Sequence, residues 1–333
     1  MFKMDFEVKV GNYRINGIES ITIESSVDLL SDKCTITFPG ALYNKPWQVE
    51  DKLKRGDKVT VKLGYNVKDN PANLHTEFVG YLRSFGPNLP MKLECEDAAY
   101  LLRKPIPDRH FKKTTAVEVI RYIVGEVNKQ LTGDSIQFVT NLKGLDYEKF
   151  TLIRANGYEA LQKIKDDFGI AIYCRTNAAG KPELHCHLAY TEKRGEVKYD
   201  FMKNVEESDD LKYIKKDDVR FRAKVIGHQK NGKTIQIEVG DKGGDLRTIH
   251  LPNVSSKESL EKAGKEHLKR LTYDGYKGSL KGWLIPVCEI GYYATVVDKE
   301  YPEREGKYFV NAVKTEFNKS GGCRTVTLGV KLS

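Results

Sequence analysis

Alternation of apolar and polar side chains, repeated over most of the chain, is the feature that most restricts the fold. Examples from the first hundred residues are FEVKV (6–10), KVTVKLGY (58–65) and MKLECED (91–97). A period of two places successive side chains on opposite faces of an extended chain, which predicts strands with one buried and one hydrated face. Turn residues such as Gly11-Asn12 and Pro87-Asn88 separate the runs. Residues 1–104 are therefore predicted to form a small antiparallel β-barrel or sandwich.

Helical spacing replaces this alternation after residue 105. Thr115 and Glu118 have the spacing of a capping box, in which two side chains satisfy free backbone amides at the start of a helix. A second helix is expected to begin near Asn156 and to end before Gly169, and a hairpin should follow it. Residues 105–200 are predicted to be an inserted α+β module with two helices and this hairpin.

Charged, aperiodic sequence in residues 201–218 predicts a linker, and alternation resumes after it. Residues 219–333 are predicted to form a second β domain, interrupted by one helix at about 255–272 that Ser255 and Glu258 could cap. Segments 56–97 and 291–332 share a rhythm of three strands, which suggests a weak internal repeat. The expected fold class is a β-rich α+β protein with two antiparallel β domains.

Composition restricts the class of protein. No apolar run is long enough to cross a bilayer, and the amino terminus lacks the apolar core of a signal peptide, so we expect synthesis in the cytoplasm and no membrane insertion. The 55 basic residues are interleaved with 46 acidic ones, which favours a mixed hydrated surface over a nucleic-acid groove. The six cysteines are widely spaced, without a C-x-x-C pair, so reduced buried thiols are expected.

A phosphate-loop pattern occurs at residues 227–234, GHQKNGKT. In a true phosphate loop a helix starts at the Lys-Thr end and adds its dipole to the phosphate site. Here TIQIEV (234–239) alternates and predicts a strand, while Asn231-Gly232 is a strong signal for a hairpin turn. We interpret the match as a hairpin and expect no nucleotide or other cofactor.

Other candidate sites also have simpler explanations. His185 and His187 would share one face of a strand with Cys186 on the other, so they supply at most two zinc ligands, and no metal site is expected. The acids Glu206-Glu207 and Asp209-Asp210 lie in the predicted linker without an assignable catalytic partner. A basic strand face of Arg220, Arg222 and Lys224 lacks the exposed aromatics of single-strand nucleic-acid binders. No catalytic residue, metal ligand or cofactor-binding residue is assigned, and the chain is predicted not to be an enzyme.

Three stretches in their order resemble a known family. They are GDKVTVKLGY with HTEFVGYLRSF (56–85), the helical segments at 114–127 and 150–187, and the final part from SSKESLEKAGKEHLKRL (255–271) to CRTVTLGVKL (323–332). Together they resemble the phage late-control gene D, or baseplate hub, family, which is related to the amino-terminal part of VgrG of type VI secretion. The likeness covers about residues 5–332.

The resemblance implies two tail-tube-like β-barrel domains with an inserted α+β segment. It further implies a homotrimeric ring that adapts a hexameric tail tube to a trimeric spike, in contact with other baseplate proteins. VgrG-like chains continue into a spike, whereas this sequence ends at Ser333, so a separate spike protein is expected. The expected location is the baseplate of a virion tail or tail-like particle, without sequence-specific nucleic-acid binding.

Two alternatives remain open from the sequence. A monomeric carbohydrate- or surface-binding module would expose aromatic residues, and five tyrosines gather in one region: Tyr273, Tyr276, Tyr292, Tyr293 and Tyr301. A tail-associated cell-wall hydrolase would need a pair of acids or a metal site, which the sequence does not suggest.

Overall fold

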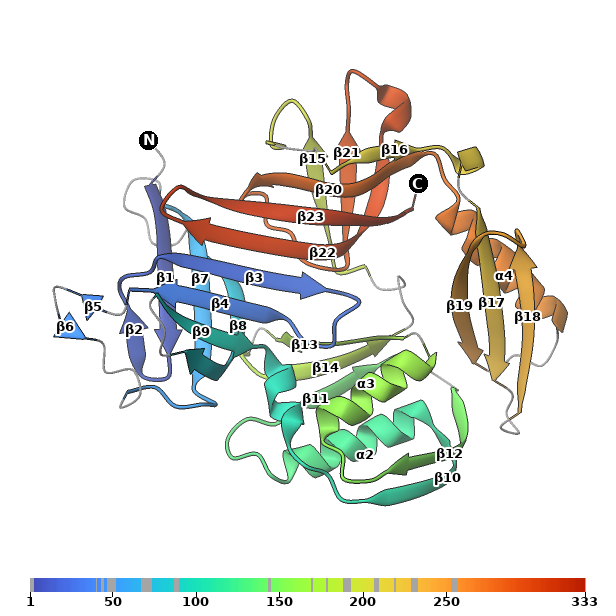
Figure 1. The fold of residues 1–333 in the computed structure, drawn as a ribbon, viewed down its shortest axis with the longest axis horizontal. Helices are drawn as coiled ribbons and strands as arrows, with labels where there is room; N and C mark the ends of the chain where they lie inside the picture. The colour runs from blue at the N-terminus through green and yellow to red at the C-terminus, as the bar shows by residue number, and fades with distance from the viewer. Residues whose placement is uncertain are drawn as a thin grey trace.

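The computed structural model describes residues 3–39, 41–42, 45–46, 52–66, 74–86, 90–142, 145–168, 170–177, 179–187, 193–206, 210–218, 220–228, 233–252 and 257–332. A large, mainly antiparallel sheet crosses the molecule, with an α+β module below it and a small sheet with one helix to the side (Figure 1). The predicted β-rich α+β class is confirmed.

The first part of the large sheet is the N-terminal β unit, as the alternation predicts. Val8, Val61 and Leu93 are among the inward residues of its core. Its strands are β1 (Lys3–Val10), β2 (Tyr13–Ile15), β3 (Ser20–Ser26), β4 (Lys33–Phe38), β7 (Lys58–Asn66), β8 (Leu74–Gly86) and β9 (Met91–Glu96), and a separate pair comprises β5 (Ala41–Leu42) and β6 (Lys45–Pro46).

The rest of the large sheet is the C-terminal β unit, which has a second apolar core that includes Leu280, Val310 and Val326. Its strands are β15 (Gly195–Asp200), β16 (Lys212–Ile214), β20 (Gly275–Trp283), β21 (Tyr292–Val297), β22 (Gly306–Asn318) and β23 (Gly321–Lys331), and the short helix η4 (Pro302–Arg304) precedes β22.

The two β units join where β22 pairs with β3. Residues Ala312–Asn318 of β22 are antiparallel to Ser20–Ser26, while the earlier part of β22 pairs with β21. The main path of pairing in this large sheet is β16-β20-β23-β22-β3-β4-β9-β8-β7-β1-β2, and β21 with its partner β15 branches off at β22. The two β units, predicted as separate barrels, are therefore continuous edge to edge.

The suggested internal repeat is present in the strand pairing. β7-β8-β9 and β21-β22-β23 are both antiparallel meanders. In each, the middle strand has 13 residues and its register shifts part-way. A register shift of this kind bends the strand and increases its local twist.

The α+β module contains the two predicted helices and the predicted hairpin. The capping box is formed, since Thr115 Oγ1 accepts from Glu118 N at 3.2 Å and Glu118 Oε2 accepts from Thr115 N at 3.0 Å. Asn156 Oδ1 likewise accepts from Glu159 N at 2.9 Å. The elements are η2 (Ala98–Arg103), β10 (Arg109–Thr115), α2 (Ala116–Asn128), β11 (Gln137–Thr140), β12 (Asp146–Leu152), α3 (Gly157–Phe168), β13 (Ala171–Thr176) and β14 (Pro182–His187).

Two segments differ from their predicted places. Residues 195–200 fall in the predicted insert, but β15 pairs in parallel with β21, because Val197 and Tyr199 belong to the core of the C-terminal β unit. The predicted linker 201–218 contains β16, which pairs with β20, and the short helix η3 (Lys216–Asp218). Charged residues obscured both strands: Glu196, Lys198 and Asp200 alternate with the buried side chains of β15, and β16 has only three residues, none of them fully buried.

An appended β unit forms a third difference within 219–333. β17 (Phe221–His228), β18 (Thr234–Gly240) and β19 (Asp245–Pro252) make their own sheet, which α4 (Lys257–Leu271) covers on one face. Gly264 permits the close approach of α4, since a Cβ there would lie 2.5 Å from Val239 Cγ2. The predicted cap residue Ser255 lies outside the described residues. How these units divide into independently folding domains stays a prediction.

Candidate assembly interface

One face of the joined sheet is polar from β20 to β9, across the seam between the two β units. Cross-strand partners place its side chains in registered rows. One row comprises Lys281, Thr325, Lys314, Glu24 and Lys33, and the next comprises Trp283, Cys323, Glu316, Thr22, Thr35 and Glu94. The apolar partners on these strands, such as Ile21, Ile36 and Val326, point to the opposite, buried side.

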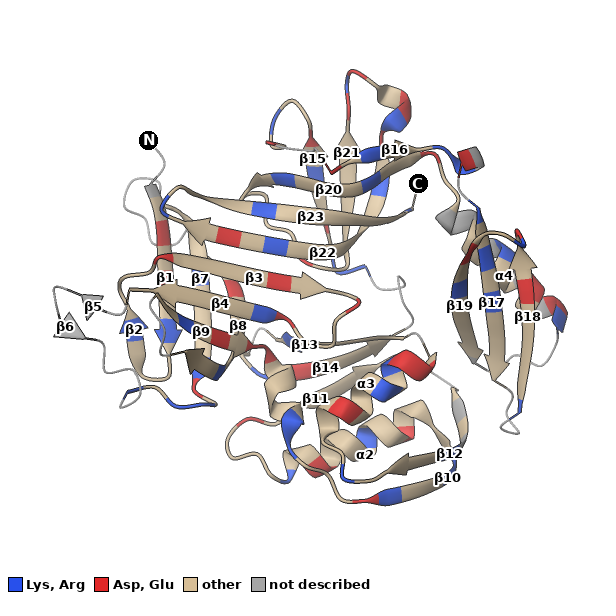
Figure 2. Ribbon diagram, in the orientation of Figure 1, with Lys and Arg blue, Asp and Glu red and all other residues tan. Residues whose placement is uncertain are grey.

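Charges of both signs alternate along this polar face, as the blue and red segments across these strands indicate (Figure 2). Lys314 Nζ lies 2.9 Å from Glu316 Oε1, and this hydrogen bond raises the pKa of Lys314. The buried centre of a lasting protein interface is apolar and depleted of charge. A charge-balanced face of threonines, lysines and glutamates therefore suits a hydrated surface better than a subunit contact.

A buried ion pair ties the two β units together beneath this face. Arg324 of β23 is 1% exposed, and its Nη2 donates to Glu77 Oε1 at 2.6 Å. Glu77 is the extra residue at the register shift of β8, because Phe78 faces Val61 and Thr76 faces Lys62. The bulge thus directs a carboxylate towards the opposite part of the sheet.

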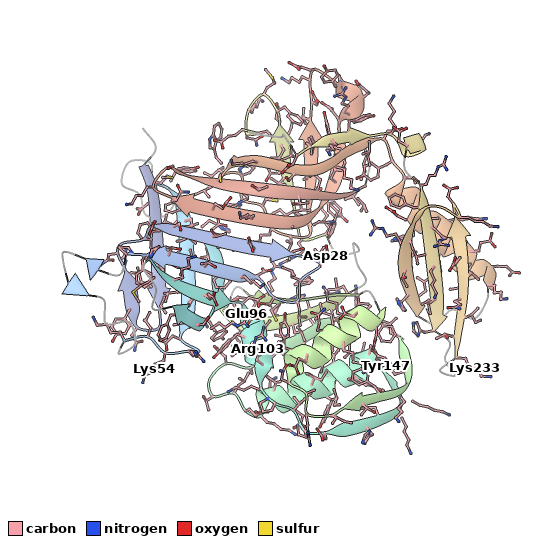
Figure 3. All side chains as sticks on the ribbon, in the orientation of Figure 1. Asp28, Lys54, Glu96, Arg103, Tyr147 and Lys233 are labelled. Atoms are coloured by element: carbon pink, nitrogen blue, oxygen red, sulfur yellow. The ribbon has the colours of Figure 1, made fainter. Side chains whose placement is uncertain are left out.

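A second ion pair lies where the N-terminal β unit meets η2 (Figure 3). Glu96 accepts two hydrogen bonds from Arg103, at 2.6 and 2.7 Å. The next residue, Asp97, accepts from the backbone amides of Ala99 and Asp32. Burial raises the pKa of Asp97 well above its usual range, and nearby Asp32 raises it further. Asp97 caps η2 and holds the backbone at Asp32, and Glu96 binds Arg103 at the end of η2, so both acids have structural roles.

Lys165 fastens the α+β module to the large sheet. Its side chain reaches from α3 to the loop after β3, where Nζ donates to Val27 O at 2.8 Å and to Leu29 O at 3.4 Å. Burial lowers the pKa of Lys165. The lysine was part of no predicted motif, because its contacts lie more than 130 residues away in the chain.

The predicted geometry of His185 and His187 is confirmed. Cys186 is buried in the core of the α+β module, while the two histidines lie on the other face of β14. His185 stacks on Tyr173 with ring centroids 5.2 Å apart, and Arg194 lies over that tyrosine at 4.8 Å. Among the described residues, no group of three or more histidines, cysteines or acids is placed to hold a metal ion. The histidines instead help to connect this module to the segment that leads into β15.

The phosphate-loop segment forms a hairpin. β17 and β18 are antiparallel, with His228 opposite Thr234, so a strand follows the match as predicted. The turn residues Asn231 and Gly232 lie outside the described residues. On the basic face of β17, Arg222 pairs with Glu238 of β18 at 3.4 Å.

A pair of histidines connects the appended β unit to the α+β module. His228 Nε2 and His250 Nδ1 are 3.1 Å apart, and the ring of Phe168 meets both imidazoles edge-on. Burial, and then the neighbouring His228, lower the pKa of His250 to about 4. The two imidazoles thus serve as a packing surface for Phe168 at the end of α3.

The tyrosines that suggested a carbohydrate platform mostly face inwards. Tyr276 is 6% exposed, and Tyr273 donates a hydrogen bond to Gly329 O at 3.1 Å. Tyr301 is the exposed member, at 45%. Of the two acid clusters, Glu207 and Asp209 lie outside the described residues, and Glu206 donates its backbone amide to Lys281 O.

No helix in the described part of the chain has the length and apolar character needed to span a membrane. No protein-family model matches the sequence, and no curated protein matches it either.

Solved structures match the architecture over nearly the whole chain. A 43 kDa tail protein of prophage MuSo2 from Shewanella oneidensis is similar at 15% identity, with a TM-score of 0.59 and 97% of each chain covered. The chain has a phage tail-protein fold. A tail protein from Neisseria meningitidis MC58 matches with a TM-score of 0.61 at 13% identity, over 98% of this chain and 96% of that one.

A type VI secretion component extends the comparison. The Escherichia coli c3393 protein, described as structurally similar to T4 bacteriophage tail proteins gp27 and gp5, matches with a TM-score of 0.56 at 12% identity. The match covers 99% of this chain and 77% of that one. A chain of the Francisella PdpA-VgrG complex also matches, with a TM-score of 0.54 at 11% identity over 99% of this chain and 58% of that one. The structural neighbours thus include phage tail and VgrG-related proteins, in agreement with the resemblance at this coarser level.

Proposed function

We propose that this protein is the hub of a tail baseplate, in a phage or a related contractile injection particle. Three copies form a ring that joins a hexameric tail tube on one side to a trimeric spike on the other. The observation that carries the proposal is the repeated meander, β7-β8-β9 and β21-β22-β23, within one continuous sheet.

The repeat explains how a ring with threefold symmetry can match a tube with sixfold symmetry. A trimer of chains that each contain two similar β units presents six of them, which is the number that a hexameric tube requires. The seam between β22 and β3, together with the Arg324–Glu77 pair, fixes the two units of one chain relative to each other. A rigid pair is needed because six units can match a tube only when their spacing is constant.

The proposed partners are the tail tube protein, a separate spike protein and other baseplate proteins. The proposed location is the particle's baseplate, after synthesis in the bacterial cytoplasm. The role is structural, without catalysis or sequence-specific nucleic-acid binding. The charge-balanced polar face supports this, because a nucleic-acid groove requires an excess of Lys and Arg.

The test is the mass and symmetry of the purified protein. Size-exclusion chromatography with light scattering should give three times the 37.8 kDa chain mass. Negative-stain class averages should show a ring with six lobes around its axis. A species that stays monomeric at every concentration and with tube and spike proteins present would overturn the proposal, and binding on a glycan array would favour the carbohydrate module.

A further inference from the structure

Two buried cysteines face each other across neighbouring strands of the large sheet. β4 and β9 lie side by side (Figure 1), and Cys34 of β4 is the cross-strand partner of Cys95 of β9. Directly opposed residues point to the same face of a sheet. Both side chains belong to the core of the N-terminal β unit, at 1% and 3% exposure. We name these two residues the Cys34–Cys95 pair.

The spacing of the strands suits a covalent bond within this pair. Just beyond the ends of β4 and β9, Asp97 N donates to Asp32 O at 3.1 Å. The Cys34–Cys95 pair lies two residues farther along the same register, so it is also a hydrogen-bonded position, where Cα atoms are about 5.5 Å apart. Disulfides span about 4.4–6.8 Å between Cα atoms. Cβ atoms of opposed residues are about 4.5–5.5 Å apart, so a small approach of the two strands brings the sulfur atoms within bonding distance.

A second pair of buried cysteines on neighbouring strands is placed differently. Cys174 of β13 is opposite Leu184, and Cys186 of β14 is opposite Ile172. The two thiols are therefore diagonal neighbours, with Cα atoms about 7–8 Å apart, which a disulfide cannot bridge unless the backbone moves. In the described strand pairings, Cys34 and Cys95 are the two cysteines that stand directly opposite each other.

The surroundings decide whether an opposed pair of thiols is bonded. The structure has all six cysteines as free thiols, which is the form that the reducing cytosol maintains. Burial raises the pKa of Cys34, and the neighbouring Cys95 raises it further. Because a thiol that rarely ionises reacts slowly, oxidation requires folding in the presence of an oxidant or a transient opening of β4 from β9.

We infer that Cys34 and Cys95 form an oxidation site, which acquires one disulfide between β4 and β9 when the protein leaves reducing surroundings. The oxidant is a small disulfide such as oxidised glutathione. The thiolate of one cysteine attacks this disulfide and releases one reduced glutathione, and the thiolate of the other cysteine then attacks the mixed disulfide and releases the second. The protein loses two thiol hydrogens, and the two glutathione thiols gain them.

The bond would cross-link the middle of the large sheet. In the main pairing path, β4 and β9 connect β3, and through it β22, to β8 and β7. The disulfide closes the loop between residues 34 and 95, which restricts the unfolded chain and so stabilises the folded one. The oxidation site goes beyond the proposed hub and does not depend on it.

The test follows the cysteines of the full chain by two routes to oxidation. In one, the folded protein is incubated with an excess of oxidised over reduced glutathione; in the other, reduced and unfolded protein is refolded in the same buffer. Remaining thiols are then blocked with iodoacetamide, and tryptic peptides are analysed by mass spectrometry. One linked peptide that joins Cys34 to Cys95 is expected, more slowly from the folded protein. If neither route gives this peptide, or if Cys174 is joined to Cys186 instead, the inference is overturned.

Variants test the assignment and its effect on stability. Cys174→Ala is the matched control, because it removes an equally buried thiol and should keep the linked peptide, whereas Cys34→Ala should lose it. Circular dichroism verifies that both variants are folded. Adding a reductant should lower the urea midpoint of the oxidised unaltered chain but not that of Cys34→Ala. Equal midpoints for the oxidised and reduced unaltered chain would overturn the stabilising role.

These outcomes are separate from those of the hub. A trimeric ring without the linked peptide would overturn the oxidation site alone. A chain that contains the linked peptide but stays monomeric with its tube and spike partners would overturn the hub alone.

Discussion

Removing one partner of the Arg324–Glu77 pair should destabilise the protein strongly. Arg324 is 1% exposed and the side chain of Glu77 is 8% exposed, so either charge left alone would have little access to water. Breaking a buried pair of this kind costs about 3–5 kcal/mol. Since a folded protein is stable by only about 5–15 kcal/mol, Arg324→Met should remove a large fraction of the free energy of unfolding.

Urea unfolding followed by circular dichroism measures this effect. The double variant Glu77→Gln/Arg324→Met should recover part of the loss, because neither charge is then buried alone. Lys314→Met is the control, since its partner Glu316 lies on the hydrated face and such pairs contribute at most about 1 kcal/mol. If Arg324→Met lowers the free energy of unfolding by less than about 1 kcal/mol, the buried pair does not hold the two β units together as argued.

Three further perturbations test other parts of the structure. Because the pKa of His250 is lowered to about 4, the unfolded chain binds a proton at this residue more readily than the folded protein does, and stability should fall as the pH drops from about 6.5 towards 4. His250→Gln should flatten the dependence of the melting temperature on pH in this range. An unchanged dependence in the variant would contradict the prediction. Gly264→Leu should speed hydrogen exchange at the amides of β17, β18 and β19, since a Cβ at this position meets Val225 and Val239. Gly125→Ala in α2 is the control, because a Cβ there has nothing within 4 Å and should stabilise the protein by up to about 1 kcal/mol. Equal protection of these amides in both variants would argue against tight packing of α4. Thr115→Ala should cost about 1 kcal/mol in urea unfolding through loss of the capping box, and no loss would show that the cap is dispensable.

Local chemistry made much of the fold predictable. The capping box at Thr115, the N-cap at Asn156 and the hairpin before Thr234 depend on neighbours within a few residues, and the structure has all three elements. The burial of Ile21, Val61 and Leu93 follows from alternation alone.

The remaining features depend on residues that are distant in sequence. β15 lies in a charged stretch and β16 has only three residues, so their pairing with β21 and β20 left only a weak pattern in the sequence. Glu77 is directed towards Arg324 by a bulge, and a shifted register has no separate sequence signal. Periodicity also does not say which strand pairs with which, so the separate sheet of β17, β18 and β19 could not be distinguished from the main one.

The exposed apolar residues illustrate the same limit. Trp283, Ile285 and Tyr301 are apolar or aromatic residues in β-rich sequence, and their pattern alone favours burial. Their exposure results from the path of the chain around Leu284 and η4, which is a property of the tertiary structure.

The seam between β3 and β22 has a consequence for biosynthesis. β3 is complete by Ser26, but its partner residues Ala312–Asn318 follow almost 290 residues later in the chain (312 − 26 = 286). At roughly 5–20 residues per second, the edge of β3 waits many seconds for this partner during translation. An unpaired strand edge is a site where other chains can add, so the nascent protein is exposed to aggregation throughout this interval. Glu24 and Lys33, charges on β3 and on its neighbour β4, would oppose such addition until β22 has been made.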